Sequence, residues 1–265
     1  MKLERSRARD YIRNLAAGGR YSFTSEEARK ALGVSAAAAK LALHRLIREG
    51  EVASPARGFY VIVPPEYTSL RCLPADQFIS ALMQRAGQPY YAALLTAAQY
   101  HGAAHHRPQE FQVMLAKSRR PLECGRVRVA FFVRKRLSEV SLQSFNTPRG
   151  PIQVSSPETT AVDLVGYQHQ IGGLDQVVTI VSELADRLDA QKLVSAAQTA
   201  PLPWAQRLGY LLERAGAADK VASLKAYIHS VAPENTALLP QQSTVGKRRD
   251  VHWKLIVNAD VEPDV

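Results

Sequence analysis

Two short helices separated by a tight turn are the feature that most limits how this chain can fold. In "YSFTSEEARKALG", Thr24 can cap a helix, and Glu27, three residues later, completes a capping box. Gly33 predicts the end of that helix. In "VSAAAAKLALHRLIREGEV", Ser35 can cap the next helix only two residues further on. Two helices joined by so short a glycine-containing turn predict a helix-turn-helix.

The second of these helices has two different sides. Ala39, Leu43 and Leu46 share one side and are expected to face a core. The other side is small at its N-terminal end and basic further along, which suits a helix that enters the major groove of DNA. The side chains expected near base edges are Ser35, Ala36, Ala37, Lys40 and Leu41. Those expected to contact phosphates are Arg20, His44, Arg45, Arg48 and Arg57.

The flanking segments extend this motif to a winged helix. Residues 5–17 predict a preceding helix that ends at Gly18-Gly19. After Gly50 the pattern predicts strands over 51–53 and 59–63, joined by a turn with Arg57 at its tip. The alternative is a small helical domain whose third helix packs against a partner, because "SAAAAKLALHRL" is also simply good helix sequence.

The rest of the chain predicts a larger mixed domain, which makes the fold class α+β. Pro64-Pro65 cannot continue a strand ladder, so we place the domain boundary there, with a winged helix over 1–66 and a second domain over 67–265. "PADQFISALMQRAG" and "YYAALLTAAQYHGA" predict helices. Strands over 110–116, 126–133, 142–146 and 152–155 predict an antiparallel meander. Five amphipathic helices follow, and a strand is expected over 254–257.

Charge is distributed unevenly along the chain. The formal net charge is +10, yet the first 150 residues carry +13 and the last 115 carry −3. Such asymmetry is typical of a protein whose front part binds a polyanion, although a basic charge can also serve solubility alone. Eight of the basic residues and one acidic residue lie between Lys117 and Leu137.

That basic segment has two interpretations. It can be one wet face of a sheet, whose arginines and lysines deter pairing at the edge, and we favour this interpretation. It can also be a second surface that contacts phosphates. The candidates for such a surface are Lys117, Arg119, Arg120, Arg126, Arg128 and Arg134.

"YHGAAHHRPQEF" raises the question of a metal site. His101 and His105 are four residues apart, which on one helix would place both rings on the same face. However, Gly102 predicts the end of the helix between them, and no glutamate follows His101 as a zincin would require. We therefore expect no metal and no other cofactor. A metal-dependent nuclease using His101, His105 and Glu158 is kept as a rival.

Other motifs narrow the function further. The chain has no GxxxxGK[ST], GxGxxG or GxSxG sequence, so we expect a protein that is not an enzyme. Cys72 and Cys124 are far apart and form no CxxC motif, which indicates a reducing compartment. No apolar run reaches 18 residues, and no secretory h-region follows the N-terminus. The expected location is the bacterial cytoplasm, without membrane contact.

Long segments of the chain resemble the AbiEi-type antitoxins of bacterial type IV toxin–antitoxin, or abortive infection, systems. The resemblance rests on the winged helix with "RGFYVIVPPEY", then "PYYAALLTAAQYHGAAHHRPQEFQV", "NTPRGPIQVSSPETTAVDLVGY", "GGLDQV", "WAQRLGYLLE" and "WKLIVNADVEPDV". It implies a winged helix that represses its own operon by binding inverted repeats in promoter DNA. It also implies a C-terminal antitoxin domain that opposes an AbiEii-like nucleotidyltransferase toxin without a stable complex. A ligand-responsive winged-helix transcription factor remains the second rival.

Overall fold

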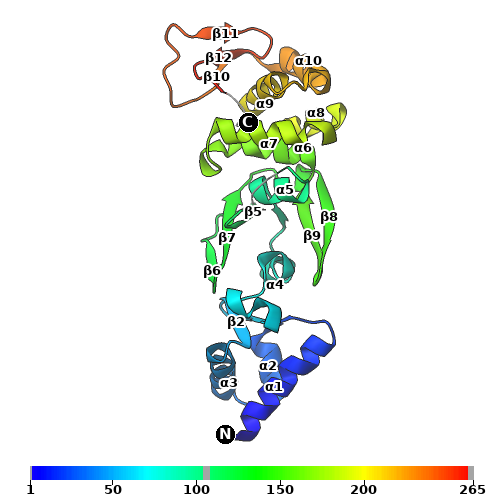
Figure 1. Cartoon of the computed structure of the whole chain (residues 1–265), viewed down its shortest axis with the longest axis vertical. Helices are drawn as coiled ribbons and strands as arrows, with labels where there is room; N and C mark the ends of the chain where they lie inside the picture. Colours follow the sequence, from blue (N-terminus) through cyan, green and yellow to red (C-terminus); the bar gives the residue numbers. More distant parts are fainter. Residues whose placement is uncertain (1, 104–107, 262–265) are drawn as a thin grey trace. The chain divides into compact units, whose positions relative to one another are not determined.

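The computed structural model describes residues 2–103 and 108–261, with side chains from residue 7 onward (Figure 1). It is a mixed α+β structure that begins with a winged helix, as the sequence predicts. The chain divides into two compact units. Unit 1 comprises Met1–Tyr90, Gln109–Val133 and Ser144–Gln153, and unit 2 comprises Tyr91–Pro108, Arg134–Gln143 and Val154–Val265.

These units do not follow the predicted boundary between residues 66 and 67. The winged helix shares unit 1 with later segments, and the wing strand β2 packs against β6 of the following sheet. Backbone contacts tie the two parts together, because the amide of Arg126 donates to the Leu70 carbonyl over 2.8 Å. Whether residues 1–66 fold independently stays a prediction.

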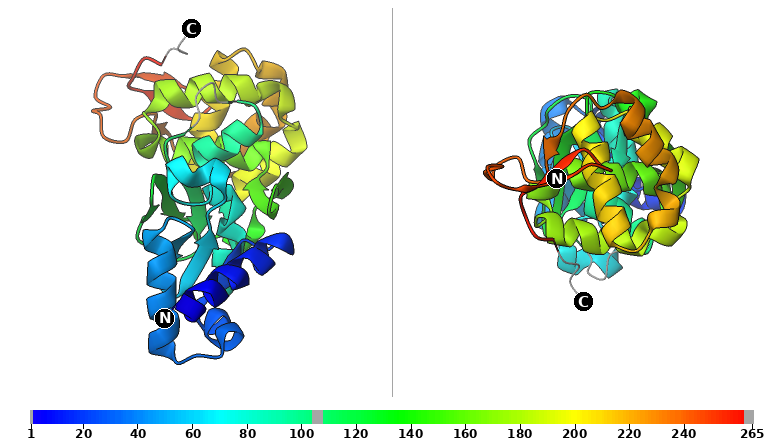
Figure 2. Two further views of the ribbon diagram at one scale, coloured as in Figure 1. Left: turned by 60° about the horizontal axis from the view of Figure 1, so that its bottom comes forward. Right: turned by 90° about the horizontal axis from the view of Figure 1, so that it is seen from above.

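The winged helix has three helices and a small antiparallel sheet, which can be followed from blue to cyan in Figure 2. Its elements are α1 (Lys2–Ala17), β1 (Ser22–Thr24), α2 (Ser25–Leu32), α3 (Ala36–Arg48), β2 (Val52–Ala56) and β3 (Phe59–Ile62). The strand order is β1-β3-β2. Its core contains Ala8, Ile12, Phe23, Leu43 and Leu46. Burying each large aliphatic side chain of this set contributes about 1.5–3 kcal/mol.

Unit 1 continues with α4 and three strands of a sheet. The bounds are α4 (Ile79–Ala86), β5 (Phe111–Leu115), β6 (Leu122–Cys124) and β7 (Val127–Val133). The predicted meander is wrong here, because β5 and β7 pair in parallel, from Phe111 with Val129 to Leu115 with Val133. The reason is the strand β6, which lies in a segment predicted to be a turn. Because β6 runs antiparallel to β7, the chain has already reversed direction before it enters β7.

The two cysteines lie together in unit 1, although they are far apart in sequence. Both are buried and free. The hydrogen bond between them, together with burial, raises the pKa of the Cys72 thiol above its usual value. Cys72 follows the linker after β3 and Cys124 ends β6, so the contact joins that linker to this sheet.

Unit 2 begins with a second departure from the prediction. "YYAALLTAAQYHGA" does not form one helix but a strand, β4 (Tyr90–Ala92), followed by a short helix, α5 (Leu94–Tyr100). Within unit 2, Ala92 of β4 pairs in parallel with Val154 of β9. The strands β8 (Leu142–Thr147) and β9 (Gly150–Ser155), whose residues are divided between unit 1 and unit 2, lie close to the predicted ranges. A fully apolar segment does not distinguish a buried strand from a buried helix, which explains the error.

Helices make up most of the remainder of unit 2 (Figures 1 and 2). They are α6 (Pro157–Gly166), α7 (Leu174–Leu184), α8 (Ala190–Gln198), α9 (Leu202–Arg214) and α10 (Ala222–Val231). A small sheet of order β10-β12-β11 follows, with β10 (Thr236–Ala237), β11 (Arg248–Asp250) and β12 (Leu255–Val257). Among the helices that the structure describes, none combines the length and apolarity needed to cross a membrane.

Candidate nucleic-acid interface

Local signals define the start of α2, its end and the start of α3. Thr24 accepts from the Glu27 amide over 3.2 Å, and the Glu27 carboxylate accepts from the Thr24 amide over 2.6 Å, which confirms the capping box. Gly33 ends α2 at φ 63°, a left-handed conformation that favours glycine. The Ser35 hydroxyl then accepts from the Ala38 amide and starts α3. The helix-turn-helix geometry therefore follows from local sequence.

Helix α3 presents two faces, as its sequence predicts. Ala39, Leu43 and Leu46 are buried in the core of the winged helix. The other side exposes small residues at its start: Ser35, Ala36 and Ala37. Leu41 is 56% exposed and lies on this same side of the helix. The face that could approach a groove is thus small, with one large apolar side chain.

The basic side chains of α3 lie further along the same helix. Lys40, His44 and Arg48 are exposed, and Arg45 is half-buried. In residues 7–103 and 108–261, no carboxylate forms a salt bridge with any of these side chains. The nearby Glu49 is held by Arg9 over 2.8 Å. The positive charge of α3 is consequently available to an external anion.

The wing is more compact than the sequence predicts. Strand β2 extends to Ala56 rather than ending at Ala53, and its register shifts between these two residues. That irregularity accommodates Pro55, which cannot donate to a ladder. Only Arg57 and Gly58 remain in the turn, and Arg57 is exposed at its tip. Arg85 donates to the Arg57 carbonyl over 3.2 Å and holds the turn against α4.

Arg20 differs from the other predicted phosphate contacts. It is exposed, but its guanidinium pairs with Glu27 and its Nε donates to the Ser22 carbonyl over 3.1 Å. A phosphate would have to compete with both partners. A phosphate contact by Arg20 therefore stays a prediction. Its guanidinium is already paired inside the protein, unlike those of Arg48 and Arg57.

The predicted second basic surface is mostly exposed. Lys117, Arg120, Arg126 and Arg128 lie at the surface of unit 1. Arg128 approaches Glu123 on the neighbouring strand at 3.7 Å. Arg119 is half-buried, its guanidinium lies 5.1 Å from the centre of the Phe131 ring, and burial lowers its pKa. Whether these residues contact nucleic acid remains a prediction.

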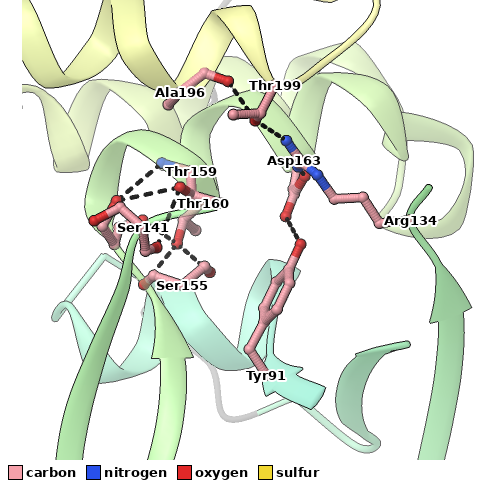
Figure 3. A network of polar contacts seen from close by, with 10 residues as sticks. Tyr91, Arg134, Ser141, Ser155, Thr159, Thr160, Asp163, Ala196 and Thr199 are labelled. Atoms are coloured by element: carbon pink, nitrogen blue, oxygen red, sulfur yellow. Dashed lines mark hydrogen bonds and ion pairs between the residues drawn. The ribbon is translucent and has the colours of Figure 1, made fainter. Parts of the chain in front are cut away.

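The assignment of Arg134 to that surface is wrong. Arg134 is 4% exposed and forms an ion pair with Asp163 inside unit 2 (Figure 3). Its Nη2 also donates to the Thr199 hydroxyl over 2.6 Å, while the Tyr91 hydroxyl donates to Asp163 over 2.8 Å. Burial raises the pKa of Tyr91, so it remains a donor. Arg134 begins the basic run Arg134-Lys135-Arg136, but β7 ends at Val133 and the Arg134 side chain that follows is buried.

This buried polar network was not predicted from the sequence. Beside the ion pair, hydroxyls at the start of α6 bond to one another and to neighbouring backbone (Figure 3). Ser156 accepts from the Thr159 amide over 3.2 Å and caps α6, as predicted. The signal in the sequence was "SSPETTAVD", a polar stretch at the start of a helix that proves to be buried throughout. The hydroxyls of this stretch form hydrogen bonds inside the protein.

The histidine segment does not gather into a metal site among the described residues. His101 is buried and its Nε2 lies 2.7 Å from the Ser155 carbonyl oxygen. Burial lowers the pKa of His101, so the ring is neutral at pH 7 and donates this hydrogen bond. Glu158 is buried and accepts from the Asp189 amide over 3.1 Å. His105 and His106 lie outside the described residues, and elsewhere no three potential ligands come together.

Comparisons with known proteins give two family models that match separate parts of the chain. Residues 10–63 match a family model described as transcriptional regulator, AbiEi antitoxin, and residues 91–214 match the AbiEi antitoxin C-terminal domain. The crystal structure of the RV2827C protein from Mycobacterium tuberculosis superposes with a TM-score of 0.70 at 17% identity, covering 96% of this chain and 90% of that one. At that identity the likeness shows the fold alone.

A second solved structure is less similar. It is an antigenic nucleotidyltransferase-like protein from Paracoccidioides brasiliensis, with a TM-score of 0.37, 12% identity, and coverage of 57% of this chain and 91% of that one. A similarity of that size carries no argument about fold or function. Comparison with curated proteins gives no match.

Proposed function

Since this chain belongs to the AbiEi family of antitoxins and transcriptional regulators, we propose that it represses its own operon through α3 and the wing and counteracts a cognate toxin. The operator would be a pair of inverted repeats in the promoter. The toxin would be an AbiEii-like nucleotidyltransferase encoded beside it. The protein would act in the bacterial cytoplasm, without catalysis of its own.

The exposed cationic side of α3 is the observation that carries the DNA-binding proposal. The start of α3 is lined by Ser35, Ala36 and Ala37, which are small enough to let the helix backbone approach base edges. Lys40 and Leu41 would then reach the groove floor. His44, Arg45, Arg48 and, from the wing, Arg57 would contact phosphates, where each neutralised phosphate releases counterions.

The antitoxin part of the proposal rests on the family match over residues 91–214. That segment contains Asp163 and the buried ion pair that it forms with Arg134. We propose that the domain opposes the toxin's effect without a stable complex. No individual residue is assigned to this activity.

Binding to a promoter fragment tests the first activity. Affinity is measured by fluorescence anisotropy for the full chain and for Arg48→Ala and Arg57→Ala. Each variant is expected to lose about 1 kcal/mol of binding free energy, because a phosphate contact is removed without changing base readout. Lys192→Ala, an exposed lysine on α8, is the matched control and should bind unchanged. If both arginine variants bind as tightly as wild type, the interface is assigned wrongly.

Co-expression with the adjacent reading frame tests the second activity separately. A Lys40→Ala/Arg48→Ala double variant is expected to lose repression of a promoter reporter yet still restore growth in cells expressing the toxin. Growth rescue that disappears together with DNA binding would contradict two separable activities. An adjacent frame that is not toxic would contradict the antitoxin proposal and leave repression standing.

A further inference from the structure

Cys72 and Cys124 are in contact within unit 1, although they lie far apart in sequence. They are the only cysteines of the whole sequence, and both are free and buried. A hydrogen bond joins their thiols. Any disulfide that forms within one chain must therefore join this pair.

The backbone around the cysteines holds their two segments closely together. The Arg126 amide donates to the Leu70 carbonyl over 2.8 Å. Gly125 follows Cys124 directly, and a side chain at Gly125 would collide with the backbone of Leu70 and Arg71. A disulfide requires two cysteines whose backbones are already near each other, which this approach of the linker to the end of β6 provides.

Cys124 also contacts the wing. Its sulfur accepts a hydrogen bond from the Ser54 amide, which lies where the register of β2 against β3 shifts. The Ser54 hydroxyl is 3.1 Å from the carbonyl oxygens of both Ala56 and Phe59, one on each strand of the wing. The sulfur of Cys124 therefore helps to hold the strand segment that leads to Arg57.

The two thiols differ in exposure and in acidity. Cys124 is 8% exposed, whereas Cys72 is 0% exposed. The hydrogen bond from Cys72 lowers the pKa of the Cys124 thiol, and the Ser54 amide adds to this effect while burial opposes it. The thiolate is the form that reacts with oxidants. A small oxidant therefore reacts first at Cys124, and the neighbouring Cys72 thiol is in place to attack the product.

We propose that hydrogen peroxide converts Cys72 and Cys124 into a reversible disulfide that displaces the wing. The Cys124 thiolate attacks one peroxide oxygen, which gives a sulfenic acid and one hydroxide ion. The Cys72 sulfur then attacks the sulfenic sulfur, so that the S–S bond forms and a second hydroxide leaves. The two thiol protons convert both hydroxides to water. Two thiols and one peroxide thus give one disulfide and two waters.

The disulfide is expected to act on the wing through Ser54. Disulfide sulfurs lie about 2.05 Å apart, closer than the sulfurs of two hydrogen-bonded thiols, so the Cys124 sulfur must move toward Cys72. A neutral disulfide sulfur is also a weaker acceptor than a thiolate. The segment before Arg57 then loses this support. The effect on DNA rests on the proposed function, whereas formation of the disulfide does not.

Mass spectrometry of the full chain tests the covalent step. Protein treated with peroxide should lose about 2 Da, the mass of the two thiol hydrogens. Tryptic digestion without reductant should give residues 72–85 joined to residues 120–126, and dithiothreitol should restore both thiols. Cys72→Ala should instead stop at a Cys124 sulfenic acid, which dimedone labels. Thiols that stay reduced, a disulfide between two chains, or sulfinic acid without a disulfide would overturn the proposal.

Fluorescence anisotropy with the promoter fragment tests the displacement of the wing. Oxidised wild type should bind about fivefold more weakly than reduced wild type, the effect of losing one phosphate contact, and dithiothreitol should reverse the change. Arg57→Ala should bind equally in both states, because its contact is already absent. Peroxide-treated Cys124→Ala controls for oxidation of methionines and should bind as it does untreated.

The outcomes separate this proposal from the proposed function. Equal binding of reduced and oxidised wild type, or an equal loss in Arg57→Ala, would contradict displacement of the wing. Reduced wild type that does not bind the promoter at all would contradict the proposed repressor function and leave the mass measurement to decide on the disulfide. Should an alanine variant of either cysteine fail to fold by circular dichroism, reversal by dithiothreitol still distinguishes the disulfide from methionine sulfoxide, which dithiothreitol leaves in place.

Discussion

Two arginines, Arg48 of α3 and Arg134, which pairs with Asp163 of α6, differ in burial and in the partners of their charge. Arg48 is exposed, and none of the described carboxylates pairs with it, so its charge is free for an external partner. Arg134 is 4% exposed and is matched by Asp163 and Thr199 within unit 2. Both residues lie in basic stretches of sequence. The difference shows that local charge density identifies a candidate surface, whereas burial decides which cations remain available.

The largest effect is expected from breaking the buried pair. Arg134→Met should lower the free energy of unfolding by about 3–5 kcal/mol, because the Asp163 carboxylate would be left buried without its cation. Urea unfolding followed by circular dichroism measures it. Arg128→Met removes an exposed arginine and should change stability by no more than about 0.5 kcal/mol. If both variants lose the same free energy of unfolding, the proposed difference between the buried and the exposed arginine is wrong.

Leu41 extends the comparison to an apolar side chain on the exposed side of α3. Leu41→Ala should cost about 1–3 kcal/mol of operator affinity, because the variant removes an apolar group from the base edges. Its salt dependence should match that of wild type, since no phosphate contact changes. Competition between operator and scrambled duplex measures the effect. Equal weakening on both duplexes would place Leu41 away from the bases.

Acid should destabilise the protein through the buried His101. Burial lowers the pKa of His101, so the unfolded chain binds a proton more readily than the folded one. The stabilisation is complete above the unfolded pKa of about 6.5 and is lost as the pH falls from there toward the folded pKa. Unfolding at pH about 7.5 and 5.5 should show a smaller decrease in stability for His101→Gln than for wild type. A larger decrease in the variant would contradict the assignment.

The smallest effect concerns the second basic surface. We expect Lys117→Ala/Arg120→Ala to leave both operator affinity and its salt dependence within error of wild type, because these side chains protect an exposed part of the sheet. Anisotropy titrations at several salt concentrations measure both quantities. A flatter salt dependence in the double variant would instead assign phosphate contacts to this surface.

The parts of the fold that local sequence specifies were predictable. The capping box at Thr24, the stop at Gly33 and the buried side of α3 depend on neighbours within a few residues. The strand β4 and the parallel pairing of β5 with β7 depend on partners distant in the chain, which an apolar pattern does not reveal. Arg134 was misplaced for the same reason, since Asp163 lies far along the sequence.

The candidate interface could be identified from sequence because helical periodicity fixes which side of α3 is free. The ion pair between Glu27 and Arg20 could not be predicted from sequence, because it depends on side-chain geometry around the capping box.

The salt dependence of operator binding is the decisive measurement for the proposed interface on α3. The logarithm of the association constant is measured against the logarithm of salt concentration for wild type and for Lys40→Ala/Arg48→Ala. If the free cations of α3 bind the duplex, the slope should become shallower by about 0.9 for each phosphate that is no longer neutralised, on operator and scrambled DNA alike. A slope identical to wild type on both duplexes would show that these cations do not face DNA.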